Sequence, residues 1–256
     1  MANRVCTIAR YTLLEAVRTR LPLAVAVALL AVLGASAFVR ELALIQDARV
    51  QTAVYAALAR VTAVSIVALH VAASITREFN DKGLDAVLAL DIPRWQYIGG
   101  RFAGYAVLAT FTAALCAVPL LALAGWAPSA AWFASLALET CIIAAVALFC
   151  AVTFSHLPSA MAFVAGFYVL CRAITGLRLV AEHPVAGVDS LAHQIAGGAL
   201  TVIALLVPPL DAWTRTAWLV DGPPGWDRIA FIAGEAAVYV TLLIAATLID
   251  FYRRSV

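Results

Sequence analysis

The sequence predicts an all-α membrane protein with six transmembrane helices, and three observations support this fold class. Apolar residues make up 64% of the chain and charged residues only 12%, with a mean hydropathy of +0.97, whereas a soluble domain is about half apolar and a quarter charged. The apolar runs approach the roughly 20 residues that a membrane span requires. These runs are continuous instead of alternating, which excludes the strands of a membrane barrel.

The 256 residues leave room for six or seven spans. We expect spans at residues 21–39, 52–76, 97–125, 131–154, 159–177 and 228–251. The segment 178–227 is harder to place: residues 191–207 are apolar enough to insert, but Gly197-Gly198 interrupts them and Pro208-Pro209 ends them. We therefore expect a re-entrant or surface-lying helical segment before the last span, since irregular backbone is tolerated where protein covers it.

The distribution of basic residues predicts the orientation. With both termini inside, ten of the 17 Lys and Arg residues lie inside, five lie outside, and Arg60 and Arg172 lie within spans. This bias matches the positive-inside rule. A seventh span would move the basic tail Arg253-Arg254 outside and weaken the bias.

Residues 3–20 are expected to form an amphipathic helix in the membrane interface. An apolar stripe of Val5, Ile8, Leu13 and Val17 opposes a basic face. Such a helix lies along the membrane surface with its arginines towards anionic headgroups. The alternative is a simple basic flank of the first span.

A polar segment at residues 77–101 separates the second and third spans. It contains four basic residues, four acidic residues and a short helical stretch, LDAVLAL, that Ile92-Pro93 closes. A short amphipathic helix between two spans, on the basic side of the membrane, is a surface that another protein can contact. The alternative is an ordinary solvated loop.

Two stretches together resemble a known family. RYTLLEAVRTRLPL precedes the first span, and ITREFNDKGLDAVLALDIPRWQYIGGRFAGY follows the second. With the six-span plan, they look like the permease subunits of type-2 ABC exporters. The closest resemblance is to the permeases of the copper-enzyme-maturation type, in which stretches like PPLDAWTR also occur.

The resemblance implies a coupling helix at about residues 81–90, which docks on a separate nucleotide-binding ATPase, while the N-terminal helix adds a second contact. The residues that match the pattern of the coupling region are Glu78, Asp81, Gly83, Leu84, Asp85, Leu88, Pro93 and Arg94. In the N-terminal helix they are Arg10, Glu15 and Arg18, and Gly100-Arg101 opens the third span. The resemblance identifies the transport machine and not its cargo.

ATP and Mg²⁺ are expected on the partner ATPase and not on this chain, because the sequence has no GxxxxGK[ST] phosphate loop. The expected assembly is a homodimer of permeases around a two-fold axis, in a bacterial inner membrane with cytoplasmic termini. The small-residue spacing Gly100 to Gly104 offers a face for close helix contact. No nucleic-acid partner is expected, and an outer-face partner of residues 178–227 remains open.

Four charged residues lie within the expected spans: Arg60, Glu139, Arg172 and Glu235. At 1.5 Å per residue, each lies roughly 8–12 Å below the outer end of its span. Isolated charges at such depths are costly. We therefore expect Arg60 or Arg172 to pair with Glu139 or Glu235. The cluster would either line a substrate path or hold the helices together.

Two other function classes remain open. A proton-coupled secondary transporter would use Glu139 or Glu235 as a proton relay, although inverted repeats typical of that class are not visible. A mechanotransmitter would pass ATPase strokes to an outer-face partner. We expect the chain not to be an enzyme and to hold no metal, because its histidines are scattered, the cysteines form no CxxC pair, and only two methionines occur.

Overall fold

The computed structural model describes residues 2–42, 48–80, 93–154, 156–182, 206–219 and 221–253, together with residues 198, 200 and 202–204. Throughout these described residues the regular structure is helical, which confirms the all-α class. The expected coupling helix at 81–90 lies outside the described residues. So does most of 183–205.

Six of the described helices are long and apolar enough to cross a membrane, so the chain is a multi-pass membrane protein. In chain order they are α2 (Leu21–Leu42), α3 (Ala48–Asn80), α5 (Arg94–Ala124), α6 (Trp126–Thr153), α7 (Leu157–Glu182) and α10 (Trp226–Arg253). They match the six expected spans, and most of their ends extend further. Pro119 lies within α5, which is a single helix, and one residue, Gly125, connects α5 to α6.

Helix α6 is the central helix of the bundle. Of its most apolar stretch 72% is buried, compared with 17% for α2 and 11% for α10. It packs against α3, α5, α7 and α10. The outer helices instead carry exposed apolar residues such as Leu30, Val238 and Leu242. These outward faces suit lipid, since hydrocarbon is as apolar as a leucine side chain.

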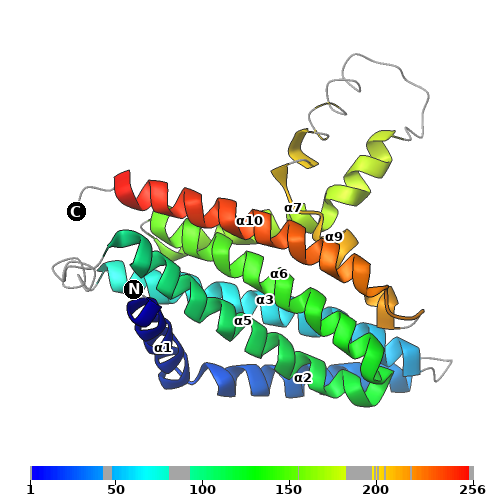
Figure 1. Cartoon of the computed structure of the whole chain (residues 1–256). Helices are drawn as coiled ribbons and strands as arrows, with labels where there is room; N and C mark the ends of the chain where they lie inside the picture. The colour runs from blue at the N-terminus through cyan, green and yellow to red at the C-terminus, as the bar shows by residue number, and fades with distance from the viewer. Residues whose placement is uncertain are drawn as a thin grey trace.

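Both termini lie at one end of the bundle, which we call the terminal end (Figure 1). Helix α1 (Ala2–Arg18) begins there, α3 ends there, α5 begins there and α10 ends there. This arrangement follows from an even number of crossings.

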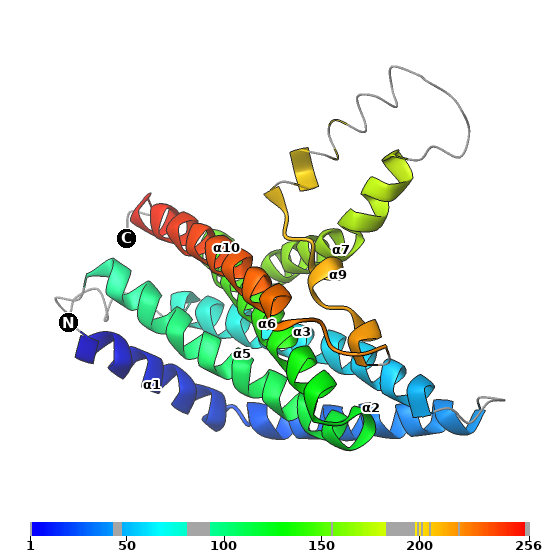
Figure 2. The same ribbon diagram turned by 45° about the vertical axis from the view of Figure 1, so that its right-hand side comes forward.

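Helix α1 runs beside α5, as both views show, and meets α2 at a turn that is clearest in Figure 1 (Figures 1 and 2). The turn is made at Arg20, whose φ of 57° is left-handed. The helix was correctly predicted. Its side towards the protein includes the buried Thr12 and Ala16, whereas Val17 of the apolar stripe is 63% exposed. That this stripe lies in the membrane interface stays a prediction.

Two glycines of α5 allow this close approach of α1. A Cβ atom at Gly100 would lie 2.8 Å from Cβ of Ile8, and one at Gly104 would lie 2.6 Å from Cβ of Thr12 and 3.0 Å from the carbonyl oxygen of Ala9. The small-residue face that the sequence offered to a second copy of the chain is thus occupied by α1. Any dimer contact must use other surfaces.

We call the described residues 206–219, which lie between α7 and α10 in the sequence, the outer segment. They form two short helices. Helix α9 (Leu210–Trp213) and a 3₁₀ turn at Thr216–Leu219 follow Pro208-Pro209. Leu210 and Trp213 are almost fully buried. Helix α9 contacts α7, beside which Figure 2 shows it. Residues 206–219 therefore pack against the helical bundle. Most of the stretch 191–207, on which the expected re-entrant segment depends, lies outside the described residues.

We expect Gly104→Ala to destabilise the α1–α5 contact by about 1–3 kcal/mol, the usual cost of overpacking. The added methyl meets a backbone carbonyl that cannot move aside. The matched control is Gly99→Ala on the same helix, where a Cβ meets nothing within 4 Å and alanine raises helix propensity. Thermal unfolding in detergent measures both. Equal midpoints for the two variants would contradict the close contact.

Candidate functional site

Three of the four charged residues within the spans meet in the structure and form what we call the Glu139 cluster: Arg60 on α3, Glu139 on α6 and Arg172 on α7. Nε of Arg60 lies 3.3 Å from Oε2 of Glu139, and Nη1 of Arg172 lies 3.9 Å from Oε1 of the same carboxylate. The expected pairing of an arginine with Glu139 is confirmed. One carboxylate therefore holds three helices together.

The cluster is deeply buried on one side and partly open on the other. The side chains of Arg60 and Glu139 are 1% and 0% exposed, whereas that of Arg172 is 31% exposed. Tyr168 on α7 lies close enough to interact electrostatically with all three charges. Because burying charges away from water costs several kcal/mol per ion unless they are paired, the ion pairs are a condition for these helices to pack.

The two arginines also hold the outer segment in place. Nη1 of Arg60 donates a hydrogen bond to the carbonyl oxygen of Thr214 at 2.6 Å. Nη1 of Arg172 donates to the carbonyl oxygen of Leu210 at 3.3 Å and to the hydroxyl of Thr214 at 2.6 Å. Leu210 is the first residue of α9 and Thr214 is the residue that follows its last, so the two arginines contact both ends of this short helix. The cluster therefore joins α3, α6, α7 and α9.

Sequence reasoning missed Thr214 and Trp132 as parts of this site. The guanidinium of Arg60 lies 5.5 Å from the ring centre of Trp132, a cation–π contact. Trp132 is fully buried, although a tryptophan near the end of a span usually lies in the aromatic belt at the membrane surface. The available signal for the backbone contact was Pro208-Pro209, which predicts an irregular segment next to the spans that carry Arg60 and Arg172.

Glu235 does not join the Glu139 cluster. It is half-exposed on α10, and its described neighbours offer it no ion pair. Its charge acts instead on Tyr239, one turn further along the same helix. The two carboxylates that were expected to share one role therefore have different surroundings.

A second group of charges lies near the terminal end, and we call it the Arg101 cluster: Arg101 on α5, Glu15 on α1 and Glu78 on α3. Nη1 of Arg101 is 2.8 Å from Oε2 of Glu15, and Nη2 of Arg101 contacts Oε2 of Glu78. Sequence reasoning named these residues as separate parts of a family pattern. The structure brings them together, so that one guanidinium joins α1, α3 and α5.

Hydroxyl groups complete the Arg101 cluster. Ser74 donates a 2.6 Å hydrogen bond to Oε1 of Glu15, and Tyr105 donates to Ser74 at 3.0 Å. Burial alone would raise the pKa of Glu15, but the hydrogen bonds from Ser74 and Arg101 and the charge of Arg101 outweigh it. The pKa of Glu15 therefore lies below its ordinary value of 4.5.

Of the remaining coupling residues, the structure describes Glu78, Pro93 and Arg94. Pro93 precedes the first turn of α5. Arg94 donates a hydrogen bond to the carbonyl oxygen of Phe251 at 3.2 Å, and its guanidinium lies over the rings of Phe251 and Tyr252. Arg94 therefore links the C-terminal end of α10 to the N-terminal end of α5. Outside the described residues lie Asp81, Gly83, Leu84, Asp85 and Leu88.

The basic residues Arg10 and Arg18 are exposed on α1, on the side away from α5, as an interface helix requires. Between them, Tyr11 and Leu14 are also exposed, at 68% and 44%. This mixture of arginines and apolar side chains is typical of helices that lie at a membrane surface. Whether the face meets lipid or protein stays a prediction.

No known protein-family model matches the chain, and no curated protein matches it. Within the described part of the chain, no group of three or more His, Cys, Asp and Glu side chains is arranged to hold a metal ion.

We expect Glu139→Ala to destabilise the protein strongly, by about 3–5 kcal/mol, because it leaves Arg60 and Arg172 without their counter-ion. Glu235→Ala, the matched control on α10, should cost far less. Thermal unfolding in detergent compares the two. Similar losses for both variants would show that the Glu139 cluster does not hold the bundle together. A stable Glu139→Ala protein without transport would instead place Glu139 in the substrate path.

We expect acidification to loosen α1. Because the pKa of Glu15 is lowered in the folded state, the stabilisation from its ion pair is present above pH 4.5 and is lost as the pH falls through the lowered pKa. A spin label on Cys6, the exposed cysteine of α1, reports the mobility of this helix. The charges of Arg101 and His70 also act on Glu15, and Glu78 pairs with the same Arg101 guanidinium.

The control for this measurement is Glu15→Gln, which keeps the shape of the side chain but cannot lose a charge. Its label should be more mobile at pH 6 than that of the wild type and should change less between pH 6 and pH 3. A wild-type label that is equally immobile across this range would contradict the role of Glu15.

Proposed function

We propose that this chain is the transmembrane permease subunit of an ATP-driven exporter in a bacterial inner membrane, with both termini in the cytoplasm. A separate ATPase would bind ATP and Mg²⁺. The observation that carries the proposal is the Arg101 cluster. It ties the N-terminal helix to α3 and α5 close to where the charged segment 77–101 joins these two helices.

This arrangement suits the transfer of force into the membrane. A push on residues 81–92 acts on the end of α3 and the start of α5 together. Arg101 is bound to Glu78 on α3 and to Glu15 on α1, so α1 would follow the same movement. Arg94 would extend it to α10 through the carbonyl oxygen of Phe251. Four helices thus respond to one contact.

The Glu139 cluster would sense that movement further along the bundle. Its members lie on α3, α6 and α7, so any tilt of α3 relative to α6 changes the contact of Arg60 with Glu139 and with Thr214. The outer segment, including α9, would shift accordingly. In the alternative, where the movement of the ATPase acts on an outer-face partner, the movement would pass through the same contacts.

A proton-coupled transporter is favoured by one observation, which concerns Glu235. Glu139 already has two guanidinium groups as ion-pair partners. Glu235 has no such partner among the described side chains and is half-exposed. A proton relay would therefore depend on Glu235 and not on Glu139.

The first test is affinity purification of the chain from its native membrane in mild detergent. We expect a stoichiometric nucleotide-binding subunit to copurify and to be lost in Asp85→Arg. This variant is preferable to a change of Arg94, which also packs against α10. The matched control is Glu41→Arg, an exposed acidic residue at the opposite end of the bundle, which should retain the subunit. If no ATPase copurifies with the wild type, the proposal is wrong.

A further inference from the structure

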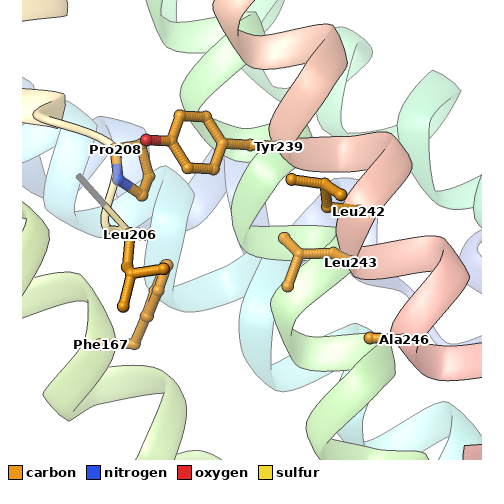
Figure 3. A pocket seen from close by; sticks show the side chains of 7 residues that line it. All are labelled: Phe167, Leu206, Pro208, Tyr239, Leu242, Leu243 and Ala246. Atoms are coloured by element: carbon orange, nitrogen blue, oxygen red, sulfur yellow. The ribbon is translucent and has the colours of Figure 1, made fainter. Parts of the chain in front are cut away.

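A groove of about 290 Å³ opens on the bundle between α7 and α10 (Figure 3). Its lining residues are Phe167, Leu206, Pro208, Tyr239, Leu242, Leu243 and Ala246. The hydroxyl of Tyr239 points towards Pro208 at one end, and Ala246 lies at the other. The volume is near the lower limit of small-molecule sites, about 300 Å³.

The groove lies within the membrane-spanning part of the chain, and its walls are apolar apart from that hydroxyl. Phe167 is in α7, and the four residues from Tyr239 to Ala246 are in α10, both of which are spans. A hydrocarbon chain or ring system fits such walls, since it exchanges lipid contacts for equally apolar protein contacts. The walls alone do not say which molecule binds.

The charges at the Tyr239 end narrow the choice. Glu235 lies one helical turn before Tyr239 on α10, at the end of the groove where the hydroxyl of Tyr239 points. The carboxylate of Glu139 and the guanidinium of Arg172 already contact each other. The carboxylate without an ion pair among the described residues at this end is therefore that of Glu235.

Glu235 is the carboxylate most in need of a counter-charge. It lies nine residues into α10, on the same face as Tyr239, and has no ion pair among the described residues. An ionisable side chain at such a depth in a span is costly and usually serves a function. The aromatic ring of Tyr239 at the same end adds a surface that attracts cations.

We infer that this groove binds an amphipathic cation, with its apolar chain along Leu242, Leu243 and Ala246 and its positive group between Glu235 and Tyr239. As a binding site the inference stands on the geometry of α7 and α10. As the class of transported substrate it rests on the proposed exporter function.

The test uses the full chain in lipid nanodiscs without any ATPase. The probe is dodecyltrimethylammonium with a photoactivatable diazirine in its chain, and the comparison probe is the same chain ending in a carboxylate. We expect the cationic probe to label α7 and α10 peptides that line the groove, and unlabelled dodecyltrimethylammonium to compete. Equal labelling by both probes, or labelling spread over all exposed helices, would overturn the inference.

Three variants sharpen the result. Glu235→Gln should weaken labelling by the cationic probe about fivefold, the upper range for one partly exposed ion pair, and leave the carboxylate probe unchanged. Ala246→Trp fills the groove and should abolish labelling. Val238→Trp places the same ring on α10 outside the groove lining, where Val238 is 59% exposed, and should have no effect. If the cationic probe labels the Ala246→Trp and Val238→Trp variants equally, the groove is not the binding site.

The labelling experiment and the affinity purification together distinguish a failure of this inference from a failure of the proposed function. If an ATPase copurifies but the groove does not bind the cationic probe, the exporter remains and this substrate class is wrong. If the groove binds the probe but no ATPase copurifies, the site remains and the exporter is wrong. The competition between the two probes needs only wild-type protein, so a variant that fails to fold leaves the test intact.

Discussion

The pairing of buried charges is the constraint on which the rest of this structure depends. Inside a membrane, water does not screen a fully buried guanidinium or carboxylate, so such a charge is costly unless it is paired within the protein. Glu139 lies between Arg60 and Arg172, and the two arginines then donate hydrogen bonds to backbone carbonyl oxygens at the two ends of α9. The positions of α3, α6, α7 and the outer segment are therefore linked by one network. Near the terminal end, Arg101 has the same role for α1, α3 and α5.

The fold class and the spans could be predicted because they follow from local composition. A run of apolar residues must be a helix in a membrane, whatever its neighbours are. The partners of the charged residues could be predicted only in part. Depth along a span narrows the choice, which is why an arginine opposite Glu139 was expected, but depth does not tell which way a helix is rotated. Glu235 has a depth similar to that of Glu139, yet it lies on another face of the bundle.

The N-terminal helix shows a second limit of sequence reasoning. Its hydrophobic pattern correctly predicted a helix, but the buried face includes Thr12 and half-buried Glu15, because these polar groups meet Arg101 and Ser74. A pattern that counts apolar residues cannot detect a face that is buried through hydrogen bonds. The glycines that receive this helix were recognised as a contact surface, but a sequence alone does not distinguish a contact within one chain from a contact between two.

Gly125 has a consequence for how the bundle can change shape. It is the whole connection between α5 and α6, and its φ of 82° with ψ near 180° belongs to a region that essentially only glycine occupies. Two spans joined by one such residue cannot slide past each other at that end. They can only rotate relative to each other about Gly125, which acts as a hinge. The displacement is then smallest at Gly125 and largest at the opposite ends of the two helices, where α5 carries Arg101 and α6 ends at Thr153.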